Sequence, residues 1–169
     1  PAPPLLPTEP LARARVRSLA QIIAADIQPL QNIAVTNYLR RELGANDDTV
    51  QAWLREWIGR GLAAFEARLA AEPGTGRFCH GDSPTHADCC LVPQCYTARR
   101  FGIDPAGFPA IARIEAACLD LDGFRAAAPE RQPDAPAGRS TDYQALHPVP
   151  VELGHREPAW GWVIGAAAL

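Results

Sequence analysis

The segment 78–102 constrains the fold more than any other, because it holds a turn, a helix start and a helix stop in one unbroken run. Gly81 lies in the expected turn. Thr85, followed three residues later by Asp88, has the form of an N-terminal capping box, in which each side chain bonds the backbone N–H of the other residue. Gly102 supplies a left-handed stop. We therefore expect a helix between Thr85 and Gly102, with Thr85 and Asp88 serving structure rather than chemistry.

A second helical pattern runs from about residue 10 to residue 41, where apolar side chains recur at steps of three and four. We expect one long helix, capped by Thr8 and bent once at Pro29, because proline cannot donate to the carbonyl four residues earlier. Gln28 and Asn32 are four residues apart and share one face of this bend. From the residues alone, their simplest role is to satisfy polar groups freed by the bend, and ligand binding is the alternative.

The clearest amphipathic pattern covers residues 47–71, with an apolar stripe on one face and charged residues on the other. Asp47 or Asp48 is the expected N-cap. Trp53 and Trp57 lie one turn apart on the apolar face. This spacing is more typical of a helix core than of a ligand-stacking pair.

Two shorter helical segments are expected over residues 109–119 and around 123–127, and no alternating run indicates a β-strand between residues 10 and 130. These patterns predict an all-α antiparallel bundle of about five helices. The expected organisation is a proline-rich interdomain-type linker over 1–10, a helical domain over 11–130 and an irregular tail of unknown role over 131–169.

Charge and cysteine content argue against several classes of protein. The formal net charge is -3 at pH 7, so no positive surplus recruits nucleic acid. No apolar run approaches the ~18 residues needed to span a bilayer, and no signal-peptide pattern occurs. Five cysteines are an odd number and favour free thiols in a reducing compartment over a disulfide framework. We expect a cytoplasmic protein that binds neither nucleic acid nor a membrane.

Thiols and imidazoles, the residue types that bind zinc, gather in and around the capped helix. Cys89 and Cys90 are adjacent on the helix, so their side chains point about 100° apart. No paired C-x-x-C spacing occurs. We expect no metal site among these residues, which are Cys79, His80, His86, Cys89, Cys90 and Cys95.

Three stretches together resemble one known family. They are DIQPLQN at 26–32, FCHGDSPTHADCCLVPQCYTARRF at 78–101 and FPAIARIEAACLDLDGFRAAAPERQPDAP at 108–136. They resemble the C-terminal domain of the zeta-class glutathione S-transferases, the maleylacetoacetate isomerases. The resemblance extends from about residue 4 to residue 136, and it implies a glutathione S-transferase C-terminal-like helical bundle.

The resemblance implies a glutathione-dependent cis–trans isomerase of a small dicarboxylic diketo acid, acting in tyrosine and phenylalanine breakdown. In the family, the glutathione thiolate adds to the cis double bond, the resulting single bond rotates, and elimination releases the trans isomer. Glutathione is the cofactor, no metal is needed, and the family forms homodimers. Gln28, Asn32, Ile33 and Ala34 match positions that contact glutathione, and Arg100 matches an arginine that receives a substrate carboxylate.

The family's N-terminal thioredoxin-like domain, with the Ser-Ser-Cys motif that activates the thiol, has no counterpart in this sequence. We therefore expect no catalytic residue in this chain. Two alternatives to maleylacetoacetate isomerisation stay open. One is the related reaction on maleylpyruvate, and the other is a truncated, non-catalytic helical interaction module.

Overall fold

The computed structural model describes residues 4–133 and residue 135. The chain divides into two units, residues 1–133 and 134–169, and the description below concerns the first. Its described residues form helices and connecting loops without a β-strand, which confirms the prediction of an all-α fold. Most of the tail predicted over 131–169 lies outside the described residues.

The first helical stretch is interrupted rather than bent once. It consists of α1 (Pro10–Gln21), the π-helical segment η1 (Ile22–Ile27), the single turn α2 (Gln28–Gln31) and α3 (Ile33–Arg41). Asn32 has ψ 144°, so the chain leaves helical geometry there and starts again. The prediction of one continuous helix, bent once at Pro29, is therefore wrong. The helix runs on through Pro29, directly after the π-helical segment, and the break comes three residues later.

Two helix caps also differ from the expected residues. Glu9, one residue after the expected Thr8, caps α1, and its carboxylate accepts from two backbone N–H groups. Asn46 caps α4 (Asp47–Ala71), instead of either aspartate that follows it, and accepts from the Thr49 N–H at 2.9 Å. The aspartates instead occupy the first turn, where they face the positive end of the helix dipole.

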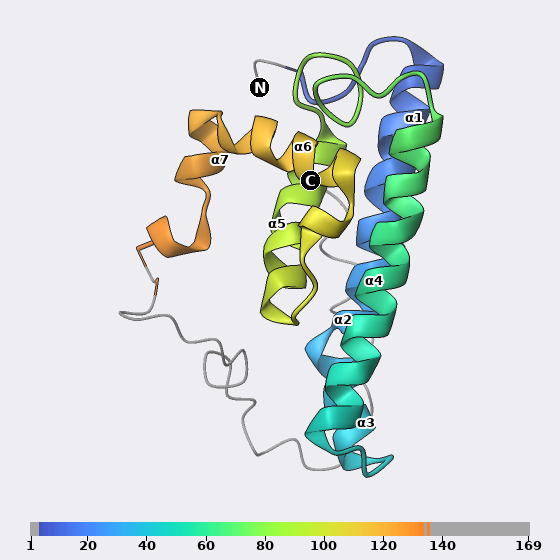
Figure 1. The fold of residues 1–169 in the computed structure, drawn as a ribbon, viewed down its shortest axis with the longest axis vertical. Coiled ribbons are helices and arrows are strands. Elements are labelled where there is room, and N and C mark those ends of the chain that lie inside the picture. Colours follow the sequence, from blue (N-terminus) through green and yellow to red (C-terminus); the bar gives the residue numbers. More distant parts are fainter. Residues whose placement is uncertain (1–3, 134, 136–169) are drawn as a thin grey trace, which may run out of the picture. The chain divides into compact units, whose positions relative to one another are not determined.

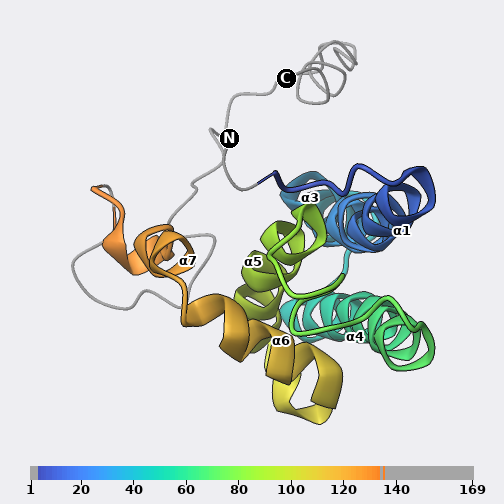
Figure 2. The same ribbon diagram turned by 90° about the horizontal axis from the view of Figure 1, so that it is seen from above.

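Three remaining helices begin and end close to the predicted residues: α5 (His86–Arg100), α6 (Pro109–Leu119) and α7 (Asp122–Ala126). Two short 3-10 turns, η2 (Pro105–Gly107) and η3 (Pro129–Arg131), were not predicted. Figure 2 shows α5 between α1 on one side and α6 on the other, and α5 contacts both helices. The segment 78–102 therefore contributes the inner helix of the bundle.

Apolar faces of α1, η1, α4, α5 and α6 meet in one core. Full burial of an aliphatic or aromatic side chain contributes roughly 1.5–3 kcal/mol, so this core dominates the stability of the unit. Its largest fully buried apolar side chains are Phe65, Phe78, Leu19, Ile23, Ile27, Ile58, Leu62, Leu91, Ile111, Ile114 and Val16.

Two polar contacts join elements at the edge of this core. The carboxylate of Glu66, on α4, accepts from the backbone N–H groups of Ala110 and Ile111 at 2.8 and 2.9 Å, and so caps α6 from a neighbouring helix. The backbone N–H of His86 donates to the Leu5 carbonyl at 2.8 Å. The described part of the proline-rich segment is therefore bonded to the start of α5.

Candidate functional site

Four of the predicted binding residues lie around the break between α2 and α3. Gln28 is the first residue of α2 and is exposed. Asn32 is also exposed, and its Oδ1 accepts from the Ala34 N–H at 2.8 Å, which caps α3 next to Ile33. The side-chain nitrogen of Asn32 makes no hydrogen bond within the described residues. The same side chain can therefore cap a helix and donate to a ligand.

Two contacts that the sequence analysis missed attach α2 to the bundle. The side-chain amides of Gln31 and Gln94 exchange two hydrogen bonds, of 3.1 and 3.0 Å. The indole N–H of Trp53 donates to the Leu30 carbonyl at 2.8 Å. Partners so far apart in sequence leave no local signal. Gln94 stands out only as a polar residue on the apolar face of its helix.

The last turn of α5 directs its two arginines to different partners. Arg99 donates to both carboxylate oxygens of the buried Glu115, on α6, at 2.7 and 2.5 Å. This hydrogen bonding raises the pKa of Arg99 above its usual value. Arg100 is half-buried and lies close enough to Tyr96, one turn earlier, to act on its phenol. Arg99 therefore belongs to the fold, and Arg100 stays the candidate for a substrate carboxylate.

Tyr96 connects this turn to the end of the described chain. Burial and a hydrogen bond to the Glu130 carboxylate raise the pKa of the Tyr96 phenol, and the positive charge of Arg100 opposes the rise. Glu130 belongs to η3, so the chain after α7 returns to α5 beside the candidate arginine.

The two groups of predicted residues both lie along the C-terminal half of α5. Gln94, which contacts α2, and Arg100 are six residues apart on α5, which is about 9 Å along the helix axis. Figure 1 shows the C-terminal end of α5 level with α2. The fold thus places the α2–α3 turn and Arg100 near the C-terminal half of the same helix, although they are far apart in sequence.

The capping box at Thr85 and Asp88 is present, and Asp88 does more than cap the helix. Asp88 is fully buried. Its Oδ2 accepts from both the N–H and the hydroxyl of Thr85, each at 2.7 Å, and its Oδ1 accepts from the Cys79 N–H at 2.8 Å. One carboxylate therefore fixes the start of α5 and the loop before it.

The cysteines are not poised for chemistry. All five are free. Burial is the main cause that raises the pKa of every thiol, to about 12 for Cys95 and Cys118. At neutral pH they are protonated, and a protonated thiol is neither a good nucleophile nor a good metal ligand. Within the part of the chain that the structure describes, no group of three His, Cys, Asp or Glu residues could hold a metal ion.

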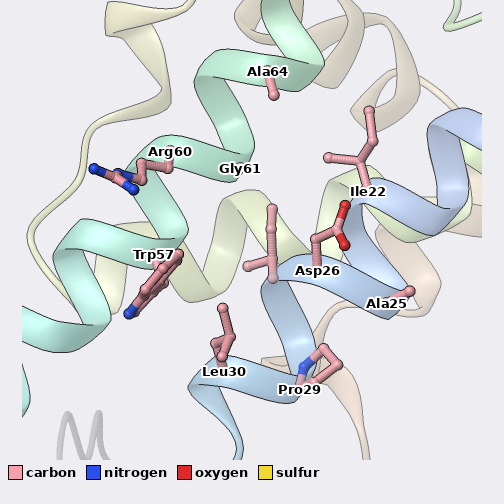
Figure 3. A pocket seen from close by; sticks show the side chains of 10 residues that line it. Ile22, Ala25, Asp26, Pro29, Leu30, Trp57, Arg60, Gly61 and Ala64 are labelled. Atoms are coloured by element: carbon pink, nitrogen blue, oxygen red, sulfur yellow. The ribbon is translucent and has the colours of Figure 1, made fainter.

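A shallow groove of about 440 Å³ lies between η1 and α2 on one side and α4 on the other. Its lining includes Ile27 and Pro29, which flank Gln28, but none of the predicted binding residues. Figure 3 shows Leu30 and Trp57 at this groove, with Gly61 and Ala64 on the α4 side. The Trp53 and Trp57 rings are 5.5 Å apart, and the Arg60 guanidinium lies over the Trp57 ring at 5.4 Å. Trp53 therefore packs against the core, and Trp57 lines the groove.

Comparison with known proteins places these features in a family. The model of the glutathione S-transferase C-terminal domain matches residues 47–130. Maleylpyruvate isomerase of Ralstonia sp is 48% identical over 135 residues, which are 80% of this chain and 64% of that protein. The chain therefore spans less than two thirds of the length of this relative. No helix in the described ranges has the length and apolar character required to cross a membrane.

Solved structures agree with this comparison. The crystal structure of maleylpyruvate isomerase from Pseudomonas aeruginosa matches with a TM-score of 0.75 and 43% identity, over 80% of this chain and 71% of that one. Maleylacetoacetate isomerase from Anaeromyxobacter dehalogenans, solved with GSH bound in its active site, matches with a TM-score of 0.74 and 48% identity, over 80% of this chain and 61% of that one.

Proposed function

This chain belongs to the zeta-class glutathione S-transferases, and on that premise we propose that it supplies the C-terminal helical domain of a glutathione-dependent maleylacetoacetate isomerase. The observation that supports the proposal most is the position of the turn from Gln28 to Ala34. The Gln31–Gln94 pair joins this turn to α5, the helix whose last residue is Arg100. The substrate is a small dicarboxylic diketo acid.

The α2–α3 turn suits the glutathione side of the site. Glutathione is a tripeptide with two carboxylates and two amides, so it needs both donors and acceptors. The exposed amides of Gln28 and Asn32 offer both. Ile33 and Ala34 lie at the positive end of the α3 dipole, although the Ala34 N–H already donates to Asn32 Oδ1. We propose these four residues as the glutathione contacts of this chain.

Arg100 suits one carboxylate of the substrate. A planar guanidinium can donate two parallel hydrogen bonds to a carboxylate, which fixes the orientation of the bound acid as well as its position. Arg99 cannot take this role, because Glu115 already accepts from both of its terminal nitrogens.

We propose that a thioredoxin-like domain activates the glutathione thiol, as the family resemblance implies. Burial raises the pKa of Cys89, Cys90 and Cys95, so these thiols do not replace glutathione as the nucleophile. Bound glutathione supplies a thiolate that adds reversibly to the cis double bond and so permits rotation. The residues of this chain hold the tripeptide and anchor the carboxylate, which keeps the double bond in reach.

Maleylpyruvate isomerisation is the second candidate activity, and the Ralstonia relative of that name favours it. Arg100 could anchor a carboxylate of either substrate, so the described residues do not separate the two reactions. A non-catalytic helical module is the remaining alternative. We also propose a homodimer, as the family resemblance implies, and a cytoplasmic location, for which the five free thiols are typical.

An isomerase assay on the purified chain, alone and fused behind a thioredoxin-like domain, tests the activity. We expect glutathione-dependent isomerisation of a maleyl substrate by the fusion and little by the chain alone. Comparing kcat/KM for maleylacetoacetate and maleylpyruvate then decides between the two substrates. An inactive fusion that is folded and binds glutathione would favour the non-catalytic module.

Variants of the fusion test the residues. Arg100→Ala should raise KM for the dicarboxylate, whereas Arg113→Ala, an exposed arginine on α6, should not. Asn32→Asp keeps the oxygen that caps α3 but loses the amide donor, so it should weaken glutathione binding without melting α3. Unchanged glutathione affinity in both Gln28→Ala and Asn32→Asp would refute the proposed contacts.

A further inference from the structure

The α2 turn is the C-terminal end of the helical run that begins with α1 and η1. It has four residues and none of them is buried. Helical geometry stops at the next residue, Asn32, and the ends of a helix are the parts that fray most readily. Contacts with neighbouring helices are therefore needed to hold this end in place next to the proposed glutathione contacts.

Two directional contacts provide that support from two different helices. Gln94, on α5, is 1% exposed, and its amide both donates to and accepts from the amide of Gln31. Trp53, on α4, donates its indole N–H to the Leu30 carbonyl. Leu30 and Gln31 are the last two residues of α2, so both contacts hold the turn at its C-terminal end.

This end of α2 decides the geometry of the proposed site. Gln31 directly precedes Asn32, whose extended backbone begins α3 and whose side chain caps it at Ala34. If Leu30 and Gln31 shift, the backbone of Asn32 shifts with them. Gln28, one turn earlier on the same short element, moves as well.

We propose that Gln94 and Trp53 are positioning residues, which lock the α2 turn so that Gln28 and Asn32 present their amides to glutathione in one fixed arrangement. This inference rests on the proposed function. The paired amides matter because hydrogen bonds fix direction, whereas apolar contacts of the same area do not. A preformed turn spares the ligand the entropy cost of ordering it.

Amide hydrogen exchange followed by NMR on the full chain tests the lock directly. In Gln94→Leu and in Trp53→Phe, the amides of Ala34 and Thr36 should exchange about tenfold faster than in the unaltered chain, because each variant removes support from the turn. Trp57→Phe is the matched control, since its indole nitrogen makes no hydrogen bond within the described residues. It should leave these rates unchanged.

A double variant separates positioning from simple stability. Replacing both Gln31 and Gln94 by Leu exchanges a polar pair for an apolar one and should recover most of the urea midpoint lost in Gln94→Leu. The amides of Ala34 and Thr36 should still exchange fast, because the directional bonds are gone. Recovery of stability and protection together would show that the pair is only packing and would overturn the inference.

Titration with glutathione, followed by NMR on the chain fused behind a thioredoxin-like domain, separates this inference from the proposed function. The Asn32 side-chain amide should shift in the unaltered fusion and shift less in its Gln94→Leu and Trp53→Phe variants. No shift in the unaltered fusion would refute the glutathione assignment, even where the exchange result holds. Normal shifts in both variants, or faster exchange spread evenly over the whole core, would refute the lock. Trp53→Phe keeps the test decisive if Gln94→Leu does not fold.

Discussion

Replacing Gly61 by Ala should destabilise the bundle, although alanine is normally the better helix residue. Gly61 lies inside α4 and faces the π-helical segment η1. A Cβ built at this glycine would lie 2.2 Å from Ile27 Cγ1 and 2.5 Å from Ile27 Cδ1. Ile27 is 1% exposed and is β-branched, so its side chain has little freedom to turn away.

The magnitude follows from two opposing effects. An added methyl group in a packed core typically costs about 1–3 kcal/mol, because it forces side chains off their rotamers and shifts backbone. Replacing glycine by alanine in a helix interior stabilises the helix by about 0.5–1 kcal/mol. The free energy of unfolding of Gly61→Ala should therefore fall by about 1 kcal/mol, and by no more than about 2.5 kcal/mol.

Gly59→Ala is the control, half a turn away on the same helix. No heavy atom lies within 4 Å of a Cβ built there. Gly59→Ala should gain the higher helix propensity of alanine without a steric clash. Its free energy of unfolding should therefore rise by about 0.5–1 kcal/mol. Opposite signs at two glycines of one helix would identify the contact with Ile27 as the cause.

Urea unfolding followed by far-UV circular dichroism measures both variants. Combining Gly61→Ala with Ile27→Ala removes the clashing atoms, so the double variant should lose less stability than the sum of the two single losses. The reasoning is refuted if Gly61→Ala is as stable as Gly59→Ala, or if the two changes at positions 27 and 61 are additive.

Three further predictions follow from buried and paired groups. Asp88→Ala should cost about 3 kcal/mol or more in urea unfolding, because the Cys79 and Thr85 backbone donors lose a buried acceptor, while removing the exposed cap in Asn46→Ala should cost about 1 kcal/mol. Arg68 and Arg15 lower the pKa of Glu72 in the folded state, so Glu72 stabilises the fold above its ordinary pKa of 4.5 and less so as the pH falls. The stability difference between the unaltered chain and Glu72→Gln should therefore shrink on acidification, and a difference that grows would contradict the assignment. Burial raises the pKa of Cys89 and Cys90 above the ordinary 9.0, so their reaction with a thiol reagent should be slow at neutral pH and still accelerate above pH 9.0, with urea abolishing the protection.

Local sequence patterns determined most of the helices and one of the caps. The apolar stripe over 47–71 and the capping box at Thr85 and Asp88 act through residues three or four positions apart, so the sequence itself contains the information. The starts of α5 and α6 were predicted correctly for this reason. The family resemblance was also a property of the sequence, and the comparisons bear it out.

Tertiary contacts decided the rest. The break at Asn32 has a local component, because asparagine is a preferred helix N-cap and its Oδ1 accepts from the Ala34 N–H. The contacts that surround the break, between η1 and Gly61 and from Gln94 and Trp53 to α2, come from other helices and leave no local signal.

The two arginines at the end of α5 show the same limit. By sequence they are equivalent cations in a last turn, and only the fold brings Glu115 against Arg99 and leaves Arg100 on the side of Tyr96. A sequence determines which short-range hydrogen bonds and helical faces are available. Which of two adjacent side chains finds a buried carboxylate depends on the packing of α5 against α6, because the partner comes from a distant part of the chain.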